Sequence, residues 1–217
     1  MAGEPIAERG WSLKRKQELA QSRIESLDMI YSCLENNPHH QVKNLISASA
    51  IGYYGDRNDE LLNEQSRAGK DFLARLCLDW EAAAYRAKAL GLRIVCLRTG
   101  IVLAREGGAR SPVATTIKLC LGAPLGDGRQ WVSWIHIEDV VGCYIHALED
   151  TTMQGTYNMV APTPISNQEM TETLAEILDR PLWLPHIPKW TVRLAMGERS
   201  MLALNSERVS ADKLLST

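Results

Sequence analysis

Residues 44–56 read Asn-Leu-Ile-Ser-Ala-Ser-Ala-Ile-Gly-Tyr-Tyr-Gly-Asp, and this stretch decides the fold class. A short apolar run bounded by turn residues is typical of a strand that is buried on both faces of a parallel sheet. Small residues at its end leave space at the carboxyl edge of the sheet, where open α/β sheets bind ligands. A strand followed by an ordinary glycine-rich turn with packed tyrosines is the alternative that these residues leave open. The hydroxyl groups expected near a ligand belong to Ser47, Ser49, Tyr53 and Tyr54.

Helices and strands alternate on both sides of this strand. Apolar spacing predicts a helix over residues 12–36 with Ser12 as its N-cap, and a second helix over residues 71–90 that ends at Gly91. A strand pattern follows over residues 93–103, with a break at Thr99-Gly100 between its two apolar parts. The order helix, strand, helix, strand favours right-handed crossovers and a parallel sheet.

Glycines and prolines divide the rest of the chain into shorter elements. The Ser166-Asn-Gln-Glu169 segment is a capping box, which marks the start of a helix. The predicted elements are a helix over 112–121, strands over 131–137 and 155–160, a helix over 166–179 and a last helix over 189–204.

Composition excludes several classes of protein. Apolar residues make up 45% of the chain, charged residues 23%, and the formal net charge is -2, without a lysine or arginine cluster that would bind nucleic acid. No apolar stretch is long enough for a membrane span. Five cysteines without a Cys-x-x-Cys pair indicate free thiols in a reducing compartment. His136 and Asp139 resemble a fragment of a zinc site or a catalytic triad, but a strand-end histidine and a helix-capping acid are the favoured interpretation. We therefore predict a cytoplasmic protein without a metal site, and its oligomeric state is left open.

Several characteristic blocks of residues lie along almost the whole chain. The main blocks are Ala2-Gly3-Glu4-Pro5, Ser47–Gly55, Trp80-Glu-Ala-Ala83, Leu97–Leu103, Gly126–Gln130, Trp134–Asp139 and Asn158–Pro162. In these blocks the sequence resembles the epimerase family of atypical short-chain dehydrogenase/reductases, which are relatives of the sugar-nucleotide epimerases. The resemblance implies an α/β, Rossmann-like parallel sheet with flanking helices that binds NADP, and a small C-terminal substrate domain. It also implies epimerase or reductase chemistry on a carbonyl or sugar-nucleotide-like substrate.

Under this resemblance the chain divides into two parts. Residues 1–103 would form the remainder of the NADP-binding domain, and residues 104–217 would lie mostly on the substrate side. The segment 131–160 would return to the Rossmann core. The family's Gly-x-x-Gly-x-x-Gly turn, which seats the pyrophosphate, does not occur in this sequence. We therefore expect an N-terminally truncated version of the fold.

A second departure concerns proton transfer. Extended short-chain enzymes use a Tyr-x-x-x-Lys pair, in which the lysine lowers the pKa of the phenol. No tyrosine of this chain is followed by lysine at that spacing, and Leu76 and Trp80 stand about where the pair would be. Two alternatives to an active enzyme therefore stay open: a pseudoenzyme that binds the cofactor without turnover, and an inert fragment of a truncated gene.

The resemblance also implies site residues. Ala2 and Val102 match backbone contacts to the cofactor, whereas Glu18 and Arg23 match side-chain contacts. An arginine is well suited to phosphate or ribose oxygens. The alternative for Glu18 and Arg23 is an ordinary solvated helix face.

Three hydroxyl groups are the candidates for catalysis. Ser49 matches a hydroxyl that bonds the reacting oxygen in active relatives. Tyr53 and Tyr54 are candidate proton donors, although an ordinary phenol, with a pKa of about 10, exchanges protons poorly at neutral pH.

Overall fold

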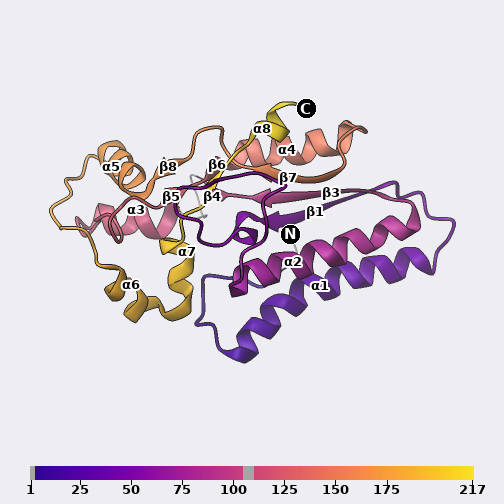
Figure 1. Ribbon diagram of the computed structural model, residues 1–217, viewed down its shortest axis with the longest axis horizontal. Coiled ribbons are helices and arrows are strands. Elements are labelled where there is room, and N and C mark those ends of the chain that lie inside the picture. The colour runs from indigo at the N-terminus through magenta and orange to yellow at the C-terminus, as the bar shows by residue number, and fades with distance from the viewer. Residues whose placement is uncertain (1–2, 105–109) are drawn as a thin grey trace.

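The centre of the molecule is a three-stranded parallel sheet in the order β1-β3-β7 (Figure 1). The computed structural model describes residues 3–104 and 110–217. Asn44 of β1 lies opposite Arg93 of β3, and β1 forms one edge of this sheet. The sheet confirms the predicted Rossmann-like fold class and its parallel strands. Its strands are β1 (Asn44–Ala50), β3 (Arg93–Thr99) and β7 (Gly155–Met159).

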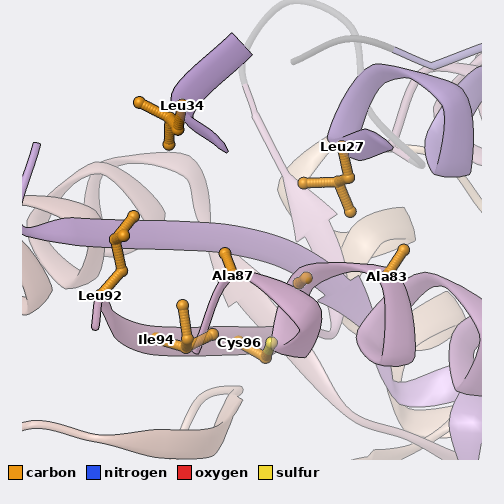
Figure 2. Close-up of a cluster of buried hydrophobic side chains, with 8 residues drawn as sticks. Leu27, Leu34, Ala83, Ala87, Leu92, Ile94 and Cys96 are labelled. Atoms are coloured by element: carbon orange, nitrogen blue, oxygen red, sulfur yellow. The ribbon is translucent and has the colours of Figure 1, made fainter. Parts of the chain in front are cut away.

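Two long helices, α1 (Leu13–Glu35) and α2 (Phe72–Arg86), cover one face of the sheet (Figure 1). The small alanine side chains of α2, and of the residue that follows it, leave room for leucine side chains of α1. These alanines and leucines pack with alternate residues of β3 in one buried cluster. Burying each leucine side chain stabilises the fold by about 1.5–3 kcal/mol. Figure 2 shows this cluster, which consists of Leu27, Leu34, Ala83, Ala84, Ala87, Leu92, Ile94 and Cys96.

Helix α4 (Ile137–Glu149) covers the opposite face (Figure 1). Val95 and Leu97 of β3 pack in the core cluster on this side. Because neighbouring residues of a strand point to opposite faces, β3 is buried from both sides, as a central parallel strand should be. Arg93 fastens α4 to the sheet, since its guanidinium donates to the carbonyl oxygen of Ala147 at 2.9 Å.

The predicted ends of the two long helices are confirmed by their caps. The Ser12 hydroxyl accepts a hydrogen bond from the backbone N–H of Arg15 at 3.1 Å. At the start of α2 the Asp71 carboxylate accepts from the N–H of Ala74 at 2.9 Å. The segment closes at Gly91, whose φ of 78° belongs to the left-handed region that favours glycine.

The remaining elements are short and pack beyond the carboxyl ends of the sheet strands or beside them. Two further pairs are parallel, β2 with β9 and β4 with β6, and β5 pairs with β8 in the antiparallel sense. These remaining helices and strands are η1 (Ile51–Tyr53), β2 (Leu61–Leu62), η2 (Ala87–Leu90), β4 (Ile101–Leu103), α3 (Arg110–Lys118), β5 (Trp131–Val132), β6 (Trp134–His136), β8 (Ile165–Ser166), α5 (Asn167–Ile177), α6 (Lys189–Met196), η3 (Gly197–Ser200), α7 (Met201–Leu204), β9 (Arg208–Val209) and α8 (Asp212–Leu215).

Two sequence predictions in this region are wrong in detail. The strand expected over residues 131–137 is two strands, β5 and β6, separated at Ser133. The last helix, expected over residues 189–204, divides into α6, η3 and α7. It divides because Gly197 takes a φ of 59°, which no residue of a right-handed helix adopts. Among the described residues, no helix is long and apolar enough to cross a membrane.

Candidate functional site

An apolar cleft of about 340 Å³ opens at the carboxyl ends of β1 and β3. Ala50 and Thr99, the last residues of these strands, line it, and so does Gly100. Leu76 and Trp80 of α2 form part of its wall. This is the edge at which open parallel sheets bind ligands, so the cleft is the candidate site.

Gly100 explains the break that the sequence shows between two apolar strands. A Cβ atom at this position would lie 2.5 Å from the carbonyl oxygen of Ser133. Only glycine therefore lets the backbone after β3 approach the segment between β5 and β6. The backbone N–H of Ile101 donates to that same carbonyl oxygen at 2.9 Å.

Ser49, the first catalytic candidate, is 2% exposed and belongs to a buried polar network. Its hydroxyl donates to the Glu81 carboxylate at 2.7 Å. The Arg98 guanidinium donates two hydrogen bonds of 2.8 Å to the same carboxylate, from Nε and Nη2. Burial by itself would lower the pKa of Arg98, but the bonds to Glu81 outweigh it and raise this pKa above its ordinary value.

The network continues from Arg98 to both tyrosines of the sequence candidate set. Arg98 Nη1 donates to the hydroxyl of Tyr54 at 3.0 Å, and this hydroxyl donates to Asn158 Oδ1 at 2.6 Å. Tyr54 has no exposed surface, and burial raises its pKa to about 12. The Tyr53 ring stacks on the Arg98 guanidinium, with 3.3 Å between Cζ and the ring centroid.

The three catalytic candidates thus lie together, but none of them is among the residues lining the cleft. Hydrogen bonds occupy the hydroxyl groups of Ser49 and Tyr54, and the ring of Tyr53 packs on a cation. The geometry gives all three a part in stabilising the junction of α2, β3 and β7. Their catalytic roles stay predictions.

We expect Ser49→Ala to lower the free energy of unfolding by about 1.5–3 kcal/mol, because Glu81 loses one charge-assisted hydrogen bond. Ser47→Ala is the matched control on the same strand, since the Ser47 hydroxyl bonds only to the adjacent Ala48 carbonyl at 3.1 Å among the contacts described. Urea denaturation of both variants measures the difference. Equal losses in the two variants would show that the bond to Glu81 contributes nothing.

The four cofactor candidates are placed differently from one another. Arg23 of α1 lines the cleft, and its guanidinium lies 5.1 Å from the ring centroid of Trp80. Glu18 pairs with Arg15 at 3.1 Å instead and is not among the lining residues. Val102 packs against the core cluster beneath α4 and is not among the lining residues. Ala2 lies outside the described residues.

Residues that fit the nicotinamide half of a dinucleotide are present in this cleft. Its apolar walls, with Ile51, Leu76 and Ile101, suit a flat ring shielded from water. Arg23 holds its position through hydrogen bonds to the carbonyl oxygens of Leu19 at 2.9 Å and Glu4 at 3.2 Å. A guanidinium has five N–H donors, so a fixed arginine of this kind can also bind a phosphate or ribose oxygen.

Glu207 is an ionisable residue of the cleft that the sequence did not indicate. It lies between α7 and β9. Burial, with smaller effects of the neighbouring Asp71 and Asp56, raises the pKa of this carboxyl group from 4.5 to about 8. Nothing in the local sequence Asn205-Ser-Glu-Arg208 distinguishes this acid from a solvated one. Only the tertiary fold reveals its surroundings.

Residues 1–159 match the family described as the NAD dependent epimerase/dehydratase family. This match covers most of the chain and all strands of the central sheet. The chain belongs to this family. The resemblance found in the sequence blocks is therefore confirmed.

Named relatives agree with this assignment. The chain is 36% identical over 210 residues to the epimerase family protein SDR39U1 homolog of Arabidopsis thaliana, a match that covers 96% of this chain and 60% of the relative. It is 38% identical over 198 residues to an epimerase family protein of Mycobacterium leprae, covering 91% of this chain and 63% of the relative. The chain thus spans somewhat less than two thirds of these relatives.

A solved structure gives the comparison in three dimensions. The human epimerase family protein SDR39U1 (isoform 2), whose crystal structure contains NADPH, superimposes with a TM-score of 0.90 at 30% identity. The superposition covers 100% of this chain and 74% of the human one. The α/β fold with its parallel sheet is therefore shared over the full length of the chain.

Proposed function

We propose that this chain provides the nicotinamide-side and substrate-side walls of an NADP(H)-dependent oxidoreductase or epimerase. The observation that carries the proposal is the apolar cleft at the carboxyl edge of the sheet, with Arg23 fixed in its wall. The similarity to a human protein solved with NADPH supports the choice of cofactor.

Each part of the cleft has a distinct role in this proposal. NADPH would supply a hydride when bound. Arg23 would bind a phosphate or ribose oxygen of the cofactor, and Trp80 would hold the guanidinium in place from its side. The apolar side chains would exclude water and orient the reacting groups, and in such surroundings each polar contact is stronger than in water.

A pseudoenzyme that binds the cofactor without turnover is the second candidate, and one observation favours it. The positions about where the Tyr-x-x-x-Lys pair would be carry Leu76 and Trp80, and both line the cleft without an ionisable group. Hydride transfer in this chain therefore needs another proton donor.

A single-turnover experiment separates the two candidates. The N-terminal segment of the human relative is fused to residues 1–217, NADPH is added in less than stoichiometric amount, and its near-ultraviolet absorbance is followed in the presence of carbonyl compounds. Loss of this absorbance with formation of an alcohol supports the oxidoreductase. A fusion that binds NADPH tightly and never oxidises it supports the pseudoenzyme.

We further propose that the protein is located in the cytoplasm. All five cysteines are free thiols, and two of them, Cys77 and Cys96, are fully buried in the fold. Free thiols of this kind persist in a reducing compartment such as the cytoplasm.

A further inference from the structure

Glu207 is held at the cleft by its own backbone. Its N–H donates to the carbonyl oxygen of Trp131 at 3.2 Å, and its carbonyl oxygen accepts from the hydroxyl of Ser133 at 2.7 Å. The same hydroxyl accepts from the N–H of Val209 at 2.9 Å. Trp131, Ser133 and Glu207 all line the cleft, so these bonds fix the acid to one of its walls.

Among the described residues of the lining, the ionisable side chains are Arg23, Cys77 and Glu207. Glu207 is therefore the carboxyl group of an otherwise apolar site. Desolvation, with smaller contributions from the charges of Asp71 and Asp56, raises its pKa to about 8. The carboxyl group therefore favours its protonated form at neutral pH and can donate a proton.

Neither of the other two ionisable groups can take this role. Burial raises the pKa of the Cys77 thiol to about 12, so it is a poor acid at neutral pH and an unreactive nucleophile. Arg23 keeps its proton under all ordinary conditions, as arginines in proteins do.

Asn205 adds a second polar group beside the acid. Its Nδ2 is buried and makes no hydrogen bond of regular geometry with any described residue. The Asn205 side chain also lies close enough to the Glu207 carboxyl group to lower its pKa, although the two side chains form no regular hydrogen bond. A buried donor of this kind gains a partner when an oxygen acceptor enters the cleft.

The charges around the cleft also indicate what it binds. A nucleotide diphosphate needs several basic groups, and Arg23 is the basic residue of the described lining. A second cleft, which Trp131 also lines, contains Arg129 and Lys189. It also contains three carboxylates, Asp56, Asp59 and Asp127, which repel phosphate.

We propose that Glu207 is the general acid and base of the cleft, and that the cleft takes an uncharged, largely apolar carbonyl compound. This inference rests on the proposed function for its hydride. A carboxylic acid fixed in the wall of the cleft, beside the Asn205 amide and within apolar walls, matches the carbonyl oxygen and the body of such a substrate.

The carbonyl carbon would gain the hydride that NADPH supplies when bound, and the oxidised cofactor would be NADP⁺. The π pair of the carbonyl group moves to its oxygen, and the proton of the Glu207 carboxyl group passes to that oxygen. The product is an alcohol, and the Glu207 carboxylate regains its proton from water.

The first test needs no cofactor. Infrared titration of the 217-residue chain should show a protonated carboxyl band that persists above about pH 6 and disappears with a midpoint near pH 8. Glu207→Gln should remove this band, whereas Glu149→Gln, at an exposed position of α4, should leave it unchanged. Asp56→Asn keeps the acid and should move the midpoint to lower pH, because it removes a neighbouring negative charge.

The second test measures binding. Benzil, an uncharged aromatic diketone, should quench the fluorescence of Trp80 and Trp131 in the cleft. Loss of the Glu207 proton removes one hydrogen bond, so binding should weaken about tenfold from pH 6 to pH 9.5. In Glu207→Gln, binding should be independent of pH. UDP-glucuronic acid should bind at least about tenfold more weakly than benzil.

Either test can overturn the inference. A protonated band that survives Glu207→Gln, or no such band above pH 6, refutes the role of Glu207. Binding of UDP-glucuronic acid that equals or exceeds binding of benzil refutes the substrate class. Both measurements omit NADPH, so their failure is distinct from failure of the single-turnover experiment, which tests the proposed function.

Discussion

Arg98→Met is expected to lower the free energy of unfolding by about 3–5 kcal/mol, because it leaves the buried Glu81 carboxylate without its positively charged partner. Arg98 is 3% exposed and Glu81 is 7% exposed, so water cannot replace the guanidinium. The variant also removes the bond from Arg98 to Tyr54 and the stacking on the Tyr53 ring. Urea denaturation, followed by circular dichroism, measures the loss as a lower midpoint at unchanged slope.

An exposed pair provides the matched control. Arg86 pairs with Asp28 between α2 and α1, with side chains that are 53% and 40% exposed. Arg86→Met should cost about 1 kcal/mol or less, since exposed ion pairs contribute little. Replacing both partners of the buried pair, by Arg98→Met with Glu81→Gln, should restore part of the stability because no unpaired charge is left. Equal costs for Arg98→Met and Arg86→Met would contradict the structural role of the network.

The sequence was sufficient for the elements that depend on local signals. Ser12 and Asp71 mark helix starts through side-chain bonds to residues three positions ahead, so their partners are fixed by spacing alone. The alternation of β3 between two apolar clusters likewise follows from its apolar run over residues 94–97. Resemblance to the family then supplied the Rossmann-like class of the fold.

Contacts between distant segments set the parts that the sequence did not reveal. Arg98 looks like an interruption in an apolar strand, and its partner Glu81 lies 17 positions earlier on a helix. Ser49 looks like a ligand-facing hydroxyl, but it meets Glu81 from 32 positions away. These pairings depend on how α2 packs on β1 and β3, and residue spacing along one element does not encode that.

Glu207 shows the same limit for the chemistry of the cleft. The acid lies close to the C-terminal end of the sequence, between two elements of only a few residues. Its elevated pKa arises mainly from burial in the folded chain, and in smaller part from Asp71 and Asp56, more than 130 positions earlier. Glu207 therefore becomes a candidate acid only in the folded chain, where its polar segment packs against the cleft.

Cofactor binding is expected to depend strongly on a segment that residues 1–217 do not contain. A polypeptide of these residues alone should show no measurable binding of NADPH or NAD at millimolar concentration in calorimetry. The sequence has no Gly-x-x-Gly-x-x-Gly turn, which supplies backbone N–H groups to the pyrophosphate. Each lost charge-assisted hydrogen bond costs about 1.5–3 kcal/mol, so several of them account for many orders of magnitude in affinity.

Fusing the N-terminal segment of the human relative to this chain should restore NADPH binding, because the human protein that shares the fold was solved with NADPH. In the fusion, Arg23→Ala should weaken binding about tenfold through loss of one charge-assisted bond at the cleft. Arg86→Ala removes an arginine of α2 that does not line the cleft and should leave the affinity unchanged. Micromolar binding by residues 1–217 alone would mean that the cofactor is anchored differently. Equal affinities for Arg23→Ala and Arg86→Ala would remove Arg23 from the cofactor site while leaving the cleft, with Glu207 in its wall, available to the substrate.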